Sequence, residues 1–371
     1  MVFGIKNKKS AKKLSKQDAP QHSNGNANAT ARHHGHQTNQ HADADPGLTA
    51  APPSFKYGGN VSKRQFDIAG LPVNVFGIDE LTPAPSRASA PQPPQVCVVI
   101  HLHGRGGSAD NEEKIARQLH DRIQRDKDAF QQQHPDAAAY QRDHLVVTFD
   151  ARNHGHRMTN QLGQQAWKQG NQNHALDLYG MIVGGARDTS FIVDLLAPYL
   201  FQHDERTVAE WVVTGKSLGG HSTWHVLANE PRIRIGVPFI GMPDYNRLLN
   251  SRTKTSFVTN GPPYVPGSLK SLINQIDPSV VDHESFDPAR NPFWGKKICV
   301  LSGAEDRLVL WDWNEKFLKE LVVGEPSGPR GEMDGLKIHR YSGVGHEVTE
   351  SMVEEAGEWI WRWGVAGQAA R

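Results

Sequence analysis

The feature that most constrains the fold of this chain is an alternation, from Phe55 onward, of short apolar runs with longer amphipathic runs. The amphipathic runs carry apolar residues at helical spacing, as Ile115, Leu119 and Ile123 do. Strands and helices in alternation are typical of a mostly parallel sheet covered by helices on both faces. The pattern therefore predicts one α/β domain over residues 55–371 with an eight-stranded sheet, whose strands we place at residues 65–69, 73–78, 96–102, 145–149, 211–213, 235–240, 298–301 and 336–341.

Residues 1–54 differ in composition from the rest of the chain. They hold few large apolar side chains among many Lys, Asn, Gln, His and Ala residues, and seven basic residues against three acidic ones. Such a segment cannot bury enough apolar surface to offset the entropy of folding. We predict a disordered basic tail, either simply solvated, or used as a targeting signal or for weak contact with an anionic surface such as lipid or nucleic acid.

The composition excludes several classes of protein. The chain of 371 residues has a formal charge of +1, which supplies no global basic field for specific nucleic-acid binding. Its longest apolar run, at residues 96–100, is far shorter than the roughly 20 residues that cross a bilayer. Cys97 and Cys299 lie inside strand-like runs, which predicts buried thiols and neither a disulfide framework nor a metal site. With no apolar signal core near Met1, we expect a cytoplasmic protein.

The alternation breaks between Gly241 and Lys296. This stretch is interrupted by several prolines and contains one short amphipathic piece, at residues 269–276. An insertion of this length between two core strands begins and ends at the working edge of the sheet. We therefore predict that residues 244–295 form a lid or a wall of a binding pocket.

One motif carries a specific chemistry. The sequence Gly215-Lys216-Ser217-Leu218-Gly219 matches the pattern G-x-S-x-G, directly after the predicted strand 211–213 and directly before a predicted helix, 218–229. In that setting the turn is too tight for side chains at positions 215 and 219, and it lifts the Ser217 hydroxyl above the sheet. The alternative is a plain glycine-rich turn between a strand and a helix.

The order of elements, with the G-x-S-x-G turn after the fifth strand, resembles the α/β-hydrolase superfamily, in particular its serine esterase and peptidase-like members. The resemblance covers about residues 60–365. The resemblance implies a serine, an acid and a histidine in that chain order. Asp306, in the loop Gly303-Ala304-Glu305-Asp306-Arg307-Leu308-Val309, is the implied acid, with Glu305 as its nearest rival. His346, in Gly343-Val344-Gly345-His346-Glu347 between the last strand and the last helix, is the implied base.

These three residue types suit nucleophilic catalysis. A serine hydroxyl is a poor nucleophile until an imidazole takes its proton, and the imidazole needs a carboxylate that fixes its tautomer and stabilises its cation. The sequence 103–108, His-Gly-Arg-Gly-Gly-Ser, is similar to the family's oxyanion motif. The resemblance implies that the backbone N–H groups of Leu218 and Arg105 stabilise the developing oxyanion, with Gly106 as the alternative second donor. His103 is then expected to hold the loop.

The remaining motifs receive structural interpretations. The loop 150–157 is similar to a histidine-containing loop of the family, and we expect His154 and His156 to pack it without binding a metal. Trp224 and Trp313 lie beside apolar runs, so we expect them in the core. Together the motifs predict a serine hydrolase that cleaves a small-molecule ester and uses no cofactor. Thioester or small-amide hydrolysis and a non-catalytic binding scaffold remain the alternatives, and the oligomeric state stays open.

Overall fold

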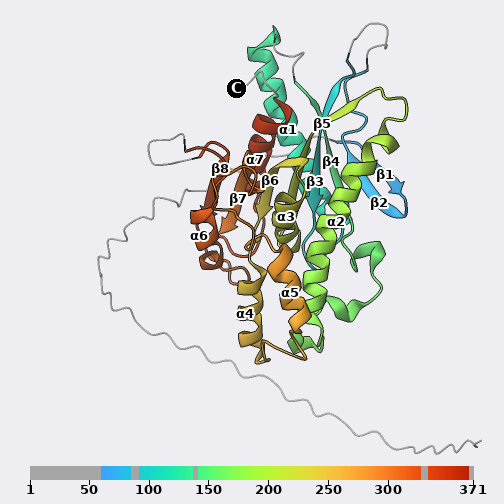
Figure 1. Cartoon of the computed structure of the whole chain (residues 1–371). Helices are drawn as coiled ribbons and strands as arrows, with labels where there is room; N and C mark the ends of the chain where they lie inside the picture. Colours follow the sequence, from blue (N-terminus) through green and yellow to red (C-terminus); the bar gives the residue numbers. More distant parts are fainter. Residues whose placement is uncertain (1–59, 85–91, 137–140, 327–332, 367–371) are drawn as a thin grey trace, which may run out of the picture. The chain divides into compact units, whose positions relative to one another are not determined.

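The computed structural model describes residues 60–84, 92–136, 141–326 and 333–366 (Figure 1). The predicted tail, residues 1–54, lies outside the described residues. No helix in the described ranges combines the length and apolar character that would span a membrane.

An eight-stranded sheet forms the centre of the described residues, in the order β1-β2-β4-β3-β5-β6-β7-β8. β2 pairs antiparallel with both β1 and β4, and all pairs from β4 to β8 are parallel. This order confirms the predicted mostly parallel sheet of the α/β-hydrolase fold. The strands are β1 (Lys63–Ile68), β2 (Leu71–Phe76), β3 (Gln95–Leu102), β4 (Asp143–Phe149), β5 (Thr207–Lys216), β6 (Ile233–Phe239), β7 (Lys297–Gly303) and β8 (Leu336–Tyr341).

Helices cover both faces of the sheet (Figure 1). The last of them continues into a single π turn, Trp361–Val365. The α-helices are α1 (Glu113–Gln133), α2 (His174–Leu200), α3 (Leu218–Asn229), α4 (Tyr245–Ser256), α5 (Gly267–Ile276), α6 (Trp311–Glu320) and α7 (Glu350–Ile360).

Successive residues of each central strand pack on opposite faces. In β3, Val96, Val98 and Ile100 belong to one apolar cluster, which contains buried side chains of α2, α3 and α6. Cys97 and Val99 belong to the other, which contains those of α1 and α7. This two-sided burial explains why the strands read as continuous apolar runs. Cys97 and Cys299 are both buried and free, as predicted.

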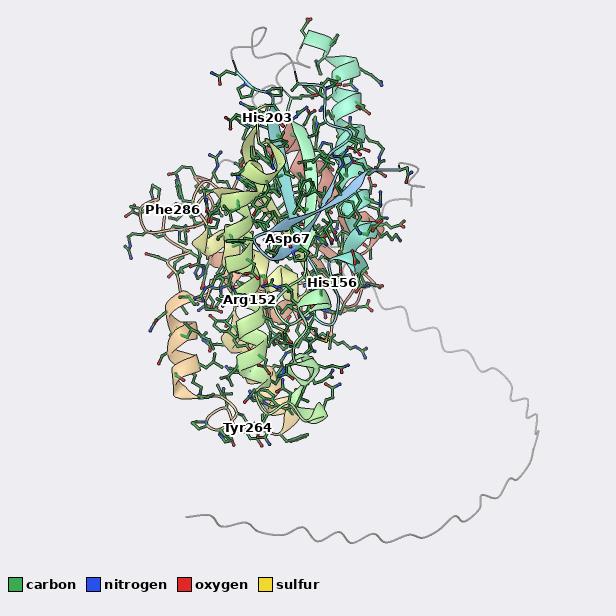
Figure 2. All side chains as sticks on the ribbon, turned by 90° about the vertical axis from the view of Figure 1, so that its right-hand side faces the viewer. Asp67, Arg152, His156, His203, Tyr264 and Phe286 are labelled. Carbon is green, nitrogen blue, oxygen red and sulfur yellow. The ribbon has the colours of Figure 1, made fainter. Side chains whose placement is uncertain are left out.

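The insertion between β6 and β7 contains a helix that the sequence interpretation missed. α4 begins after Asp244, whose side chain accepts a hydrogen bond from the Arg247 N–H at 2.9 Å. Its polar sequence presents only a narrow apolar strip, and Leu248 and Leu249 pack with the first half of α2 and with α5 in a third apolar cluster. Figure 2 shows α2 running along both the sheet and this insertion. Tyr264 marks the end of the insertion that lies away from the sheet.

A buried ionic cluster joins α1, β4 and the segment before β5. Asp143 accepts hydrogen bonds from Lys127 and from Arg206, each at 2.8 Å, and all three side chains are buried. Burial alone would raise the pKa of Asp143, but the contacts with Lys127, Thr82 and Arg206 outweigh it and lower the pKa below its usual value. The carboxylate is therefore the counterion for two buried cations.

We predict that Asp143→Asn destabilises the protein, because it leaves Lys127 and Arg206 buried without their carboxylate. The expected loss in the free energy of unfolding is about 3–5 kcal/mol near neutral pH. Since the folded-state pKa of Asp143 is lowered, its contribution is present above the unfolded pKa and declines as the pH falls through the folded pKa. Urea unfolding at several pH values measures both effects. The exposed Asp128→Asn is the control, and an equal loss in both variants would contradict the prediction.

Candidate active site

Ser217 occupies a strained turn between β5 and α3. Its backbone has φ 54° and ψ −107°, a conformation that a residue with a side chain rarely adopts. A Cβ atom on Gly215 would lie 2.3 Å from the Gly219 carbonyl oxygen, and one on Gly219 would lie 2.2 Å from that of Leu102. These close approaches confirm that the turn excludes side chains at positions 215 and 219.

Ser217, His346 and Asp306 form one hydrogen-bonded row. The Ser217 hydroxyl donates to His346 Nε2 at 2.8 Å, and His346 Nδ1 donates to Asp306 Oδ2 at 2.7 Å. Asp306 Oδ1 accepts from the N–H groups of Leu308 and Val309 at 2.8 and 3.0 Å. The Asp306 side chain is buried, whereas Glu305, its rival in the sequence, is exposed. The geometry thus selects Asp306 as the partner of His346.

The electrostatics of Asp306 suit a carboxylate that remains ionised. Burial by itself would raise its pKa, because a carboxylate loses water there. The hydrogen bonds from His346 and from the two backbone N–H groups outweigh burial and lower the pKa below its usual value. A negative charge is therefore available to orient His346 and to stabilise its protonated form.

The parallel sheet explains why residues so distant in sequence meet. Ser217, Asp306 and His346 follow the carboxyl ends of β5, β7 and β8, which lie at one edge of the sheet. The loops after β7 and β8 are joined by two backbone hydrogen bonds, from the Ala304 N–H to the Tyr341 carbonyl and from the Glu305 N–H to the Val344 carbonyl, each at 2.9 Å. These bonds hold the acid and histidine loops in register.

The loop after β3 brings the predicted oxyanion donors to the same place. Arg105 and Leu218 line one cavity together with Ser217 and His346. Neither the Arg105 nor the Leu218 N–H donates a hydrogen bond within the described ranges. The Gly106 N–H, in contrast, donates to His154 Nε2 at 3.1 Å. Of the two alternatives for the second donor, Arg105 therefore has the available N–H group.

The side chains of His103 and His154 hold the loop after β3 in place through hydrogen bonds to backbone groups. His103 Nδ1 donates to the Gly104 carbonyl at 2.8 Å, and its Nε2 accepts from the Ala151 N–H at 2.9 Å. Burial lowers the pKa of His103 to about 4, so the ring is neutral. His154 is also buried and donates from Nδ1 to the Arg152 carbonyl at 3.0 Å. Both rings hold backbone groups, in agreement with their structural interpretation.

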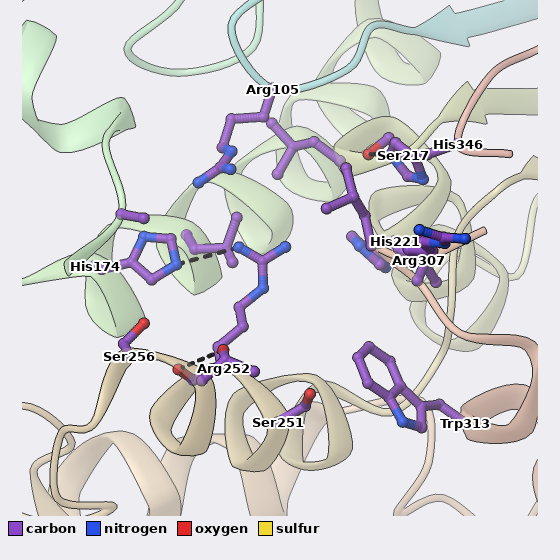
Figure 3. Close-up of a pocket in the computed structure, with 16 residues that line it drawn as sticks. Arg105, His174, Ser217, His221, Ser251, Arg252, Ser256, Arg307, Trp313 and His346 are labelled. Carbon is purple, nitrogen blue, oxygen red and sulfur yellow. Dashed lines mark hydrogen bonds between the residues drawn. The ribbon is translucent and has the colours of Figure 1, made fainter. Parts of the chain in front are cut away.

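A cavity of about 390 Å³ lies beside the Ser217 hydroxyl. Several of its walls were not identified from the sequence. α4 contributes Arg252, a residue with no motif around it, and Trp313 lines the cavity although we expected it in the core. Trp224, in contrast, is fully buried in the core, as expected. The residues that line the cavity are Arg105, Ala166, His174, Leu178, Ser217, Leu218, His221, Ser251, Arg252, Thr255, Ser256, Arg307, Leu308, Val309, Trp313 and His346 (Figure 3).

Within the described ranges, no group of three or more His, Cys, Asp or Glu side chains is arranged to hold a metal ion. The charge of Lys216, next to Ser217, is directed away from the cavity. Its Nζ lies 3.4 Å from Glu112, which also contacts His101 at 3.3 Å. Burial would raise the pKa of Glu112, but His101 and Lys216 lower it to about 2. Lys216 thus has Glu112 as its partner and does not line the cavity.

Comparison with known proteins supports the fold. No protein-family model and no curated protein sequence matches the chain. The solved structure of TT1662 from Thermus thermophilus covers 82% of this chain and 98% of its own, with a TM-score of 0.52 and 19% identity. The 2,6-dihydroxy-pseudo-oxynicotine hydrolase covers 82% of this chain and 68% of its own, with a TM-score of 0.46 and 18% identity. Est1E from Butyrivibrio proteoclasticus covers 80% and 98%, with a TM-score of 0.44 and 16% identity.

At 19% identity the likeness to TT1662 concerns the fold alone. It agrees with the strand order and with the turn at Ser217, and together they establish the α/β-hydrolase fold for this chain.

We predict that Asp306→Asn lowers the rate at which Ser217 reacts with an activated ester by roughly 10⁴-fold, because an amide favours the wrong tautomer of His346. Glu305→Gln, the matched control one residue away, should retain most of the wild-type rate since Glu305 is exposed. Stopped-flow release of 4-nitrophenol from an activated ester measures both. A crippled Glu305→Gln beside an active Asp306→Asn would show that the acid is misassigned.

Proposed function

We propose that this chain with the α/β-hydrolase fold is a serine hydrolase that cleaves a carboxylic ester through an acyl-enzyme on Ser217. The observation that carries the proposal is the bridging position of His346, which contacts Ser217 Oγ at 2.8 Å and Asp306 Oδ2 at 2.7 Å beside a cavity. A histidine with only a surface role would not be expected within hydrogen-bond distance of both a strained serine and a buried carboxylate.

The geometry supports acylation in two proton-balanced steps. Ser217 Oγ attacks the ester carbonyl carbon while its proton passes to His346 Nε2. The Asp306 carboxylate stabilises the imidazolium, and the carbonyl oxygen, now negative, is placed to accept from the N–H groups of Leu218 and Arg105. The carbon–oxygen bond to the leaving alcohol then breaks, and His346 Nε2 returns its proton to that alcohol. The acyl group remains on Ser217.

Deacylation repeats the sequence with water as the nucleophile. His346 takes a proton from water as the hydroxyl attacks the acyl carbon, and the same two N–H groups face the oxyanion. Collapse of the intermediate releases the carboxylic acid, and His346 returns the proton to Ser217 Oγ. Water reaches the site through the cavity beside the Ser217 hydroxyl.

The alternatives differ in the leaving group or in the absence of chemistry. A thioester or a small amide could be cleaved by the same residues, and the amide is the most demanding because its nitrogen must be protonated as it leaves. A non-catalytic scaffold would not need the ionised Asp306 that the hydrogen bonds maintain. Matched ester, thioester and amide substrates with one acyl group separate the chemical alternatives.

We predict that Ser217→Ala lowers kcat for a 4-nitrophenyl ester by on the order of 10⁴-fold or more, because it removes the nucleophile. A fluorophosphonate probe should label the wild type and not the variant. Circular dichroism and thermal unfolding check that the variant is folded. Ser222→Ala, within α3 and outside the cavity lining, controls for the loss of a hydroxyl. Turnover by folded Ser217→Ala at the wild-type rate would exclude the acyl-enzyme.

Removal of residues 1–54 should leave kcat/KM for a small ester nearly unchanged. Every described residue that lines the cavity lies between Arg105 and His346, and the polar composition of residues 1–54 predicts that they contribute nothing to the core. Steady-state kinetics on the shortened and full-length chains test this. If the tail contacts an anionic surface, deletion weakens binding to anionic vesicles, most strongly at low salt. Loss of activity on a soluble ester would place the tail in the site.

A further inference from the structure

The cavity beside Ser217 has an unusual charge balance. Three arginines line it, Arg105, Arg252 and Arg307, and none of the described lining residues is an aspartate or a glutamate. The nearby carboxylate of Asp306 is already bound to His346 and to two backbone N–H groups. A ligand in this cavity therefore meets a positive potential that no lining carboxylate cancels.

Arg252 reaches the cavity from α4. Its Nη1 donates to His174 Nε2 at 3.2 Å, and His174 Nδ1 donates to the Gln165 carbonyl at 2.9 Å. Burial, followed by the charges of Arg252 and Arg105, lowers the pKa of His174 to about 4. The ring that Arg252 contacts is therefore neutral, so the contact orients the guanidinium and leaves its charge uncompensated.

Arg105 extends from the loop after β3 towards the same part of the cavity. Figure 3 shows the guanidinium groups of Arg105 and Arg252 extending into the cavity from above and below in this view, with His174 on the left and Ser217 beside His346 on the right. Burial, together with the positive charge of Arg105, lowers the pKa of Arg252 to about 10. Two like charges, a partly buried one on Arg252 and an exposed one on Arg105, thus face the same cavity.

Several arginines elsewhere in the described ranges that are buried or partly buried have carboxylate partners. Arg122 contacts Glu354 at 2.7 Å, Arg157 contacts Asp188 at 2.7 Å, and Arg206 contacts Asp143 at 2.8 Å. Within the described ranges, neither Arg105 nor Arg252 forms an ion pair with any carboxylate. Two guanidinium groups that line one cavity without a carboxylate partner suit the binding of an oxyanion.

We propose that the substrate of this enzyme carries an anionic group, a carboxylate or a phosphate, which binds between Arg105 and Arg252 while its ester carbonyl lies at Ser217. This inference rests on the proposed ester hydrolysis and names the class of ester. The anion neutralises the two arginines, which share the cavity with His346. It thereby removes the repulsion that they exert on the imidazolium formed when Ser217 attacks.

The first test compares esters of matched size and different charge. Mono-4-nitrophenyl adipate places a carboxylate where 4-nitrophenyl hexanoate has a methyl group, and 4-nitrophenyl 6-aminohexanoate places a cation there. We expect kcat/KM for the adipate to exceed that for the hexanoate by roughly 10- to 100-fold, with the amine as the poorest substrate. 4-Acetoxybenzoate and its methyl ester make the same comparison with the anion on the alcohol side.

The variants assign the preference to the arginines. Arg252→Gln should reduce the ratio of the two kcat/KM values, anionic over neutral, by roughly tenfold or more, and Arg252→Lys should restore part of it. Lys254→Gln removes a positive charge from the same helix without altering the cavity lining and should leave the ratio unchanged. Faster cleavage of neutral esters by the wild type, or an equal effect of Lys254→Gln, would overturn the inference while ester hydrolysis stands.

A binding measurement decides the inference even if no ester is cleaved. In full-length Ser217→Ala, adipate or inorganic phosphate should raise the Tm in a concentration-dependent manner, and Arg252→Gln in that background should abolish the increase. A larger effect of adipate favours a carboxylate on the substrate, and a larger effect of phosphate favours a phosphate. No increase with either anion would refute the anion site, independently of the fate of the proposed chemistry.

Discussion

The close backbone approach at the turn between β5 and α3 is the constraint on which the candidate site depends. The Ser217 N–H donates to the Phe239 carbonyl at 3.0 Å, and the Gly219 N–H donates to the His103 carbonyl at 3.1 Å. These bonds attach the turn to the ends of β6 and β3. Glycine at 215 and 219 is required because a Cβ atom would overlap the neighbouring backbone. The same contacts therefore keep Ser217 in the turn above the sheet and place the loop that contains Arg105 beside it.

A strained turn needs rigid surroundings, since a non-glycine residue at positive φ costs about 1–3 kcal/mol. The surroundings here are two apolar clusters on the faces of the sheet and a third between α2, α4 and α5. The third cluster also contains Leu218 and Val309, which adjoin the serine and acid loops. Packing of the insertion thus supports the site mechanically as well as forming a wall of its cavity.

The charges around the cavity divide into paired and unpaired groups. Lys216 contacts Glu112. His103 and His154 are neutral, and each forms a hydrogen bond with a backbone group. Asp306 is committed to His346. Three arginines remain that face the cavity: Arg105 from the loop after β3, Arg252 from the insertion and Arg307 from the loop after β7. The arginine from the insertion and the residues around Ser217 thus come from different parts of the chain.

The sequence alone determined the strands, their alternation with helices, and the position of the turn at Ser217. These follow from local patterns, and α3 (Leu218–Asn229) and β8 (Leu336–Tyr341) have the bounds that the patterns predicted. Tertiary structure decided the rest. α4 depends on packing against α2 more than on its own polar sequence, and this packing holds Arg252 in the wall of the cavity that Arg105 also lines. Burial and hydrogen bonding distinguish Asp306 from Glu305, and a contact with His154 removes the Gly106 N–H from use. Such contacts join residues far apart in the chain, and no local pattern records them.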